Sequence, residues 1–356
     1  MDDVGLCPML LSPVYQGYIW GGSYFKKEYE RTVPFETTAE SWEVSACPDG
    51  VSTILNGPCA GMGLDKAAKV LKEELLGSLV EGDSFPLLFK LIDAQDTLSV
   101  QVHPDNVYAR ENENGGSGKT EMWYVLKAEN DARLIYGFKQ DLTREELEQA
   151  IANEELPDHL NEIPTGEGDV VFIDAGMVHA VGRGVVLAEI QQSANITYRL
   201  HDWGKVDENG EPRPLHLAKA LDVLSLESMV GHEIMPVLAI ENEDYTRKML
   251  CCCRYFAAEF VSFDGDVKER THNRSFHILF FPNDGATIEY PDHEKQPHII
   301  EVAKGGTALI PAGLMKYTVR GKGEYLKYYV PEFDADFLQP LVEHGYTEDQ
   351  VLDLLR

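Results

Sequence analysis

The chain carries many short segments rich in valine, isoleucine, leucine, tyrosine and phenylalanine, separated by clusters of glycine, proline, aspartate and asparagine. Branched and aromatic side chains favour an extended backbone, and frequent turn residues keep each strand short. Many short strands divided by turns are typical of a β-sandwich or β-barrel, so we predict a mainly β fold with a few short helices. The predicted strands cover residues 86–92, 98–103, 122–127, 132–136, 169–173, 185–191, 275–281 and 324–330.

A few segments have helical patterns instead. Residues 64–79 place apolar side chains on one face at helical spacing. Thr143 with Glu146, and Thr347 with Gln350, each have the spacing of a capping box at a helix N-terminus. We predict helices at residues 64–79, 143–151 and 216–228, and a last one after Thr347.

One sequence pattern occurs twice. Residues 168–179 read GDVVFIDAGMVH and residues 305–316 read GGTALIPAGLMK, so both copies run from glycine through a strand into an Ala-Gly turn. Because glycine tolerates positive φ, we expect each copy to form a turn between two barrel strands. Two copies in strand-rich regions indicate two β-barrel domains. The acidic stretch 241–247 separates them, which predicts domains at 1–238 and 239–356.

The net charge of −29, with a sequence pI near 4.7, restricts the partners of this chain. Such an acidic surface repels nucleic acids and anionic membranes, so we expect neither as a partner. No apolar run is long enough to span a bilayer. An anionic small substrate would need a few well-placed lysines or arginines to overcome the overall field.

The cysteines and the N-terminus indicate a cytoplasmic protein. Three of the six cysteines are consecutive, at residues 251–253, and none forms a C-x-x-C pair. This pattern suits reduced, buried thiols rather than a disulfide framework or a zinc–thiolate site. The first residues, MDDVGLC, carry acids where a secretory signal would carry a basic stretch.

Three segments of the N-terminal half carry candidate metal ligands. Side chains alternate along a strand, so Gln101 and His103 share one face of residues 98–103. Glu121 opens the next apolar strand, and His179 follows the turn of the first repeat. Taken singly, each has an ordinary explanation. Gln101 and His103 could lie on the surface, Glu121 could be a solubilising charge, and His179 could be a hydrogen-bonded core residue. Together they are the ligand types of an open, catalytic metal site, and they suit Zn, Fe, Mn or Ni.

Longer motifs resemble a known family. Residues 89–106, FKLIDAQDTLSVQVHPDN, and residues 118–126, GKTEMWYVL, resemble the signature region of type I phosphomannose isomerases, members of the cupin superfamily. Further matches are YIWGGSY at 18–24, ESWEVSA at 40–46 and EIQQSANITYRLHDWG at 189–204. The resemblance extends from about residue 10 to about residue 335, and the length is similar to that of the compact bacterial form.

The resemblance implies a fold, a reaction and a cofactor. The fold would be two cupin-type jelly-roll β-barrels, and the reaction the interconversion of mannose 6-phosphate and fructose 6-phosphate through an enediol. The cofactor would be one zinc ion per chain, bound by Gln101, His103, Glu121 and His179. These are the ligand candidates that the strand pattern had already singled out.

The resemblance also implies three catalytic residues: Arg199, Lys119 and Glu189. Isomerisation needs a group that polarises the carbonyl, a base that moves the carbon-bound proton, and cations that stabilise the enediolate. Zinc suits the first task, and Arg199 or Lys119 the third. For the base, Glu189, a zinc-bound water and Lys119 all remain open.

The phosphate of the substrate needs a cation of its own. Four side chains in the motif regions are candidates. The matched motifs favour Lys119 and Arg199, because they place both near the metal. The four candidates are Lys90, Lys119, Arg183 and Arg199.

Two other functions fit parts of the same pattern. A metal-dependent oxygenase or decarboxylase with two cupin domains would use iron or manganese, but such enzymes typically carry a third histidine where this chain has Gln101. A non-catalytic sugar-binding protein could also use the fold, since a fold does not fix a function. Metal analysis tests the first alternative, and an isomerase assay tests the second.

The second copy of the repeat predicts a domain without metal. The residue aligned with His179 is Lys316, and a protonated lysine has no lone pair for a metal. His272 and His277 are five residues apart beside a strong strand, so alternation places them on opposite faces. We therefore expect the C-terminal domain to serve packing rather than chemistry.

Overall fold

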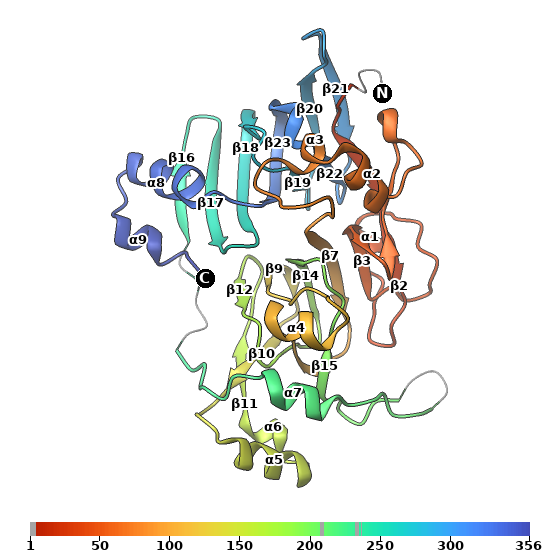
Figure 1. Cartoon of the computed structure of the whole chain (residues 1–356), viewed down its shortest axis with the longest axis vertical. Coiled ribbons are helices and arrows are strands. Elements are labelled where there is room, and N and C mark those ends of the chain that lie inside the picture. Colours follow the sequence, from red (N-terminus) through yellow and green to blue (C-terminus); the bar gives the residue numbers. More distant parts are fainter. Residues whose placement is uncertain (1–4, 207–209, 232–234, 236) are drawn as a thin grey trace. The chain divides into compact units, whose positions relative to one another are not determined.

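The computed structural model of the chain describes residues 5–206, 210–231, 235 and 237–356 (Figure 1). Its regular structure is mostly strands, which confirms the mainly β fold. Every predicted strand overlaps an observed one, although β23 (Lys316–Tyr329) is much longer than its prediction. All six cysteines are buried thiols outside any disulfide.

The chain divides into two compact units. We call residues 15–41 with 90–235 the central unit. The rest of the chain, residues 1–14, 42–89 and 236–356, forms the terminal unit.

This division differs from the predicted domains 1–238 and 239–356. The change of unit near residue 236 lies close to the predicted boundary, but residues 1–14 and 42–89 group with the C-terminal part. The reason is strand pairing: β1 (Met9–Ser12) pairs with β22 (Thr307–Ile310) and also with β6 (Thr53–Ile54). Pairing between strands so distant in sequence leaves no periodic signal in either segment.

Two antiparallel sheets frame the central unit. Apolar residues from both sheets, including Trp123, Leu134, Val171 and Val181, form one buried cluster between them. The first sheet has the order β11 (Leu160–Pro164), β10 (Arg133–Phe138), β13 (His179–Val181), β8 (Val100–Val102) and β15 (Tyr198–His201). The second has the order β12 (Val170–Ile173), β9 (Glu121–Ala128), β14 (Val185–Gln192), β7 (Leu87–Ala94), β3 (Glu40–Val44) and β2 (Val14–Gln16).

One large sheet dominates the terminal unit. Its main path runs β16 (Leu238–Glu241), β17 (Tyr245–Cys252), β18 (Ala257–Arg270), β23, β19 (His277–Phe280), β22, β1 and β6. The hairpin of β20 (Ala286–Pro291) and β21 (Pro297–Val302) joins through β23, as seen in Figure 1. Its buried cluster includes Phe263, Leu279, Ile288 and Tyr325. A small separate ribbon pairs β4 (Ala46–Cys47) with β5 (Gly50–Val51).

The two units repeat one strand order. The run β12-β9-β14-β7-β3 of the central unit corresponds to β22-β19-β23-β18-β17 of the terminal unit. The sequence repeat lies at matching places: β12 ends at Ile173 and β13 starts at His179, while β22 ends at Ile310 and β23 starts at Lys316. Both connections therefore have the same length, which supports the predicted relation between the two halves.

The two turns differ in backbone conformation. In the first copy Gly176 has a φ of 91°, as expected of a turn glycine. In the second copy the positive φ falls on Met315, at 68°, instead of on the aligned glycine. The strand that follows the second turn therefore begins in a different backbone orientation from the strand that follows the first.

The helices are short, as expected. Both predicted capping boxes form, at Thr143 and at Thr347. The segment 64–79 breaks at Lys72, whose φ is 47°. The segment 216–228 stops at Val223, because the chain then turns to bond Ser225 to the carbonyl of Gly176.

The α-helices are α1 (Tyr24–Glu28), α2 (Leu64–Leu71), α3 (Glu73–Leu76), α4 (Asn106–Asn112), α5 (Arg144–Ala152), α6 (Leu156–His159), α7 (Leu217–Val223), α8 (Gln339–Glu343) and α9 (Glu348–Leu352). Tighter or wider turns form η1 (Gly57–Cys59), η2 (Ala312–Leu314) and η3 (Asp334–Leu338). Within the described ranges, no helix combines the length and apolar character needed to cross a membrane.

Gly176 provides a test of the first turn. A Cβ atom there would lie 2.8 Å from the carbonyl oxygen of Val223, and φ is already 91°. We expect Gly176→Ala to lower the free energy of unfolding by about 1–3 kcal/mol, as measured by denaturant titration. Gly166→Ala is the control, because a Cβ there meets nothing within 4 Å. Equal stability of the two variants would contradict this role of the turn.

Candidate metal centre and active-site pocket

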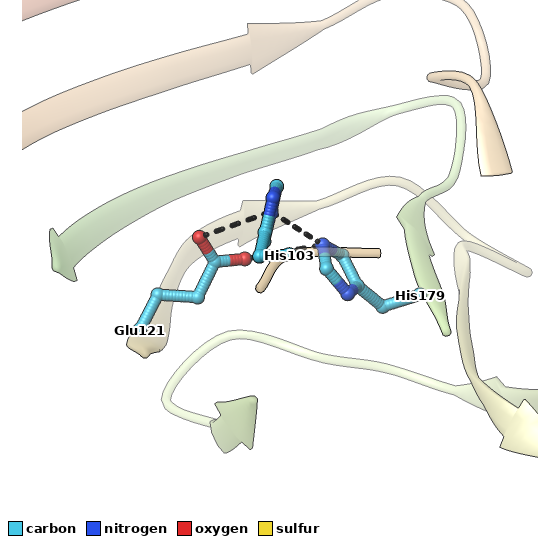
Figure 2. Close-up of side chains that lie close together, drawn as sticks. All are labelled: His103, Glu121 and His179. Atoms are coloured by element: carbon cyan, nitrogen blue, oxygen red, sulfur yellow. Dashed lines mark hydrogen bonds and ion pairs between the residues drawn. The ribbon is translucent and has the colours of Figure 1, made fainter. Parts of the chain in front are cut away.

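Three predicted metal ligands meet in the interior of the central unit. His103 follows β8, Glu121 opens β9 and His179 opens β13, and all three are fully buried. Their candidate ligand atoms lie within 4.8 Å of one another. Figure 2 shows the three side chains turned toward a common point. The Nε2 atoms of the two histidines are 3.1 Å apart, and Glu121 Oε1 lies 3.3 Å from His179 Nε2.

Backbone carbonyls orient both imidazoles. His103 Nδ1 lies 2.7 Å from the carbonyl oxygen of Ile196, and His179 Nδ1 lies 2.8 Å from that of Met177. A carbonyl only accepts hydrogen bonds, so each Nδ1 carries the proton and donates it. Each Nε2 then presents a lone pair to the common point, as in metal sites where a second interaction fixes the histidine tautomer.

Burial keeps both histidines in the neutral state that a metal needs. It lowers the pKa of His103 well below its ordinary value and that of His179 to about 3, so both rings are neutral. Burial, with the charge of Glu189, raises the pKa of Glu121 to about 7. Within the described part of the chain, no hydrogen-bond donor reaches Glu121 Oε1. Two lone pairs and an unsatisfied carboxylate oxygen in a dry interior fit a divalent cation.

Gln101 borders this cluster. It pairs across the sheet with His179 on one side and with Arg199 on the other, so the three side chains share one face. Its amide nitrogen lies 3.3 Å from His179 Nε2. The four predicted ligands are thus brought to one place, with Gln101 at the edge toward solvent.

Lys119 also reaches the cluster. Its ammonium group lies 2.8 Å from Glu121 Oε2 and 3.1 Å from His103 Nε2, and the residue is buried. The same group is 3.9 Å from Glu189 Oε1. Lys119 therefore connects the metal ligands with the second buried carboxylate.

Glu189 is held as an ion. Lys90 Nζ lies 3.0 Å from its Oε1, and Trp123 Nε1 donates a hydrogen bond of 2.9 Å to its Oε2. Burial alone would raise the pKa of Glu189, but the charges of Lys90 and Lys119 outweigh burial and hold the pKa below its ordinary value. Lys90 lies 3.6 Å from Glu40 as well, so this predicted phosphate ligand is already engaged by two carboxylates.

A pocket of about 270 Å³ opens beside the cluster. Gln101, Lys119, Glu189 and Arg199 all line it, so the predicted catalytic residues face one space. The full lining is Tyr18, Trp20, Glu40, Lys90, Ile92, Leu98, Ser99, Gln101, Lys119, Trp123, Val181, Glu189, Asn195, Thr197, Arg199 and Arg213.

The arginines of this region separate into two groups. Arg199 and Arg213 both line the pocket, and Arg213 was not a predicted site residue. Its charge acts with burial to lower the pKa of Arg199, so the two guanidinium groups are close. Arg183 lines a different pocket, with Trp203 and Arg133, and is not brought to this site.

The corresponding positions of the terminal unit carry different residues with different contacts. Register places His277 opposite Ile310, as Glu121 lies opposite Ile173. His277 is buried and its Nδ1 lies 2.7 Å from the hydroxyl of Tyr317. Among the residues that the structure describes, the only group of three or more potential histidine, cysteine or acidic metal ligands is the one in the central unit.

Comparisons with known proteins identify the family of this chain. Residues 9–154 match the family described as phosphomannose isomerase type I, catalytic domain. Mannose-6-phosphate isomerase of Streptococcus mutans serotype c is 43% identical over 319 residues, which cover 90% of this chain and 91% of that protein. Mannose-6-phosphate isomerase ManA of Bacillus subtilis is 34% identical over 322 residues, covering 89% of this chain and 97% of that protein.

A solved structure gives the same result. The crystal structure of mannose 6-phosphate isomerase from Bacillus subtilis superimposes with a TM-score of 0.82 at 32% identity, covering 90% of this chain and 99% of that one. The likeness therefore spans nearly the whole length of these relatives. The chain belongs to the type I phosphomannose isomerase family.

Proposed function

We propose that the chain interconverts mannose 6-phosphate and fructose 6-phosphate with one zinc ion held by His103, Glu121 and His179, and with Gln101 as a fourth ligand. The observation that carries this proposal is the convergence of two neutral imidazole nitrogens and a carboxylate on one dry point beside a polar pocket. Ligands of this type without thiolate suit zinc in an open, catalytic site. When bound, the ion supplies Lewis acidity that polarises a substrate carbonyl.

The proton transfer is assigned to Glu189. It lines the pocket as an ionised carboxylate, so it can accept the proton from C2 of the open-chain sugar and return it to C1. Its lowered pKa makes it a weak base, so the enediolate must be strongly stabilised by nearby cations. Lys119, which lies 3.9 Å from Glu189, supplies one of these positive charges.

The two pocket arginines are assigned different tasks. Arg199 lies in one cross-strand row with Gln101 and His179, so it is placed to stabilise charge that develops near the metal. Arg213 uses Nε and Nη2 to bind Asp202. That arrangement leaves Nη1 for the substrate phosphate, so Arg213 is assigned to phosphate binding.

The fold assignment belongs to the same proposal. Each unit is interpreted as a cupin-type jelly roll, and the shared order of five strands supports this view. The central unit is assigned the chemistry, and the terminal unit is assigned to packing. The buried thiols suit the reducing cytoplasm.

The first test is metal dependence. Purified protein should contain about one zinc per chain, and chelation should abolish isomerase activity and lower the Tm, since a bound metal stabilises the folded state. His103→Ala or His179→Ala should lose zinc and lower activity more than about 100-fold. His277→Gln, which alters a buried histidine of the terminal unit, should keep its zinc.

Full activity in metal-free protein would refute zinc catalysis. Bound iron or manganese in place of zinc would favour the oxygenase or decarboxylase class. Zinc without isomerase activity would leave a sugar-binding protein.

The second test concerns the base. Glu189→Gln keeps the shape of the side chain, so zinc content should be unchanged while kcat falls by about 100- to 10,000-fold. Exchange of the C2 hydrogen of mannose 6-phosphate with solvent should be lost in parallel. Glu40→Gln is the matched control, because Glu40 also contacts Lys90 and lines the pocket. If kcat fell strongly in Glu40→Gln and not in Glu189→Gln, Glu40 would be the base instead of Glu189.

The third test separates the two arginines. Arg199→Ala should lower kcat by about 100- to 1,000-fold with a small change in KM, as expected when charge stabilisation in the transition state is removed. Arg213→Ala should raise KM for the sugar phosphate by about 10- to 100-fold, since a hydrogen bond to a charged group contributes about 1.5–3 kcal/mol. Arg199→Lys should not restore full activity, because an ammonium cannot replace the planar fork. If Arg199→Ala mainly raised KM and Arg213→Ala mainly lowered kcat, Arg199 would bind the phosphate and Arg213 would stabilise the transition state.

A further inference from the structure

A second polar pocket lies within the terminal unit. It encloses about 280 Å³ between β18, β23 and the β20–β21 hairpin, whose arrangement is visible in Figure 1. Four cationic side chains line it: Lys268 and Arg270 on β18, Lys316 on β23, and Lys295 in the hairpin turn. The isomerase site needs none of these residues.

Three of the cations are held on one face of the sheet. Arg270 and Lys316 lie directly opposite each other in the antiparallel pair of β18 and β23, and Lys268 is two residues away on the same face. All three are exposed, whereas Glu269 and Tyr317 between them are buried on the other face. Like charges directly opposite each other destabilise a sheet. An anion bound between them would remove that repulsion.

The carboxylates in the pocket wall are already neutralised. Glu269 faces the interior, where Lys327 lies 3.1 Å and Arg247 2.6 Å from its oxygens. Glu289 is paired with Arg320 at 2.8 Å. Considering the described ranges only, none of the four pocket cations makes an ion pair. The pocket lining therefore has more positive than negative side chains, on a chain whose net charge is −29.

The hairpin gives the pocket a fixed wall. Pro291 and Pro297 pair with each other at the end of β20 and β21, and both line the pocket. Proline fixes its own φ, so this wall loses little freedom when a ligand binds. The volume suits a small molecule, and the acidic chain repels long polyanions such as nucleic acids.

We propose that this pocket is a second binding site, separate from the isomerase site, for the phosphoryl group of a small molecule. Lys268, Arg270, Lys295 and Lys316 supply the charge, and the side chain of Thr318, which also lines the pocket, supplies a hydroxyl donor. The ligand class is free phosphate or a phosphorylated metabolite of sugar size.

The test uses the full-length, zinc-loaded protein. Inorganic phosphate and fructose 6-phosphate are each titrated by calorimetry at constant ionic strength. The variant Arg270→Ser with Lys316→Ser should lose one binding equivalent per chain for at least one of the two ligands. Its kcat and KM, measured in buffer without added phosphate, should equal those of the unaltered protein. The ligand that loses the equivalent identifies the source of the phosphoryl group.

The control has the same change of net charge. Lys304→Ser with Lys322→Ser removes two exposed cations of the terminal unit that lie outside the pocket, and it should keep every binding equivalent. Unchanged stoichiometry in the pocket variant for both ligands would overturn the proposal, as would an equal loss in the control.

A second measurement does not depend on the stoichiometry. In buffer without phosphate, Lys316→Ser should have a Tm at or above that of the unaltered protein, because the cross-strand repulsion is relieved. Added phosphate should raise the Tm of the unaltered protein and of the control, and raise that of Lys316→Ser clearly less. An equal rise in all three proteins would contradict the site.

Discussion

Two imidazole nitrogens and a carboxylate face one another in a fully buried space, an arrangement that a bound cation would stabilise. The backbone carbonyls of Ile196 and Met177 accept hydrogen bonds from the two Nδ1–H groups, so both Nε2 atoms, 3.1 Å apart, present their lone pairs to the interior. Other features of the central unit serve this geometry. The positive φ of Gly176 turns the chain back so that His179 enters the interior, and the pairing of β13 with β8 places His179 beside Gln101.

The terminal unit has the same order of five strands, but the charges in its interior are balanced. Its interior holds two carboxylates, Glu259 and Glu269, and two cations, Arg247 and Lys327, and each carboxylate contacts both cations. In the central unit each corresponding strand carries a charge of the opposite sign. Glu40, Lys90 and Glu189 occur where the terminal unit has Arg247, Glu259 and Lys327. A closed set of opposite charges offers no surplus negative charge to a metal.

The sequence was sufficient for features that depend on local pattern. Strands and capping boxes follow from alternation and short-range spacing, whereas the grouping of His103, Glu121 and His179 was implied by the resemblance of longer motifs to a known family. It was insufficient where partners are distant in the chain. Nothing near Met9–Ser12 indicates pairing with Thr307–Ile310, and nothing near Arg213 indicates that it binds Asp202 and lines the pocket. Such contacts are set by tertiary packing, which a single sequence does not encode in a periodic form.

Backbone as well as side chain distinguishes the second copy of the repeat from the first at the position of His179. Alignment without gaps places Lys316 at the position of His179, but Lys316 is exposed while the next residue, Tyr317, is buried and contacts His277. Positive φ at Met315, instead of at the turn glycine, accompanies this shift of one residue. Since alternate residues of a strand face opposite sides, a histidine at 316 would lie on the outer face of the sheet. The same shift places Lys316 opposite Arg270 on that face, so the conformation of one turn both keeps residue 316 out of the interior and brings its charge to the pocket of the terminal unit.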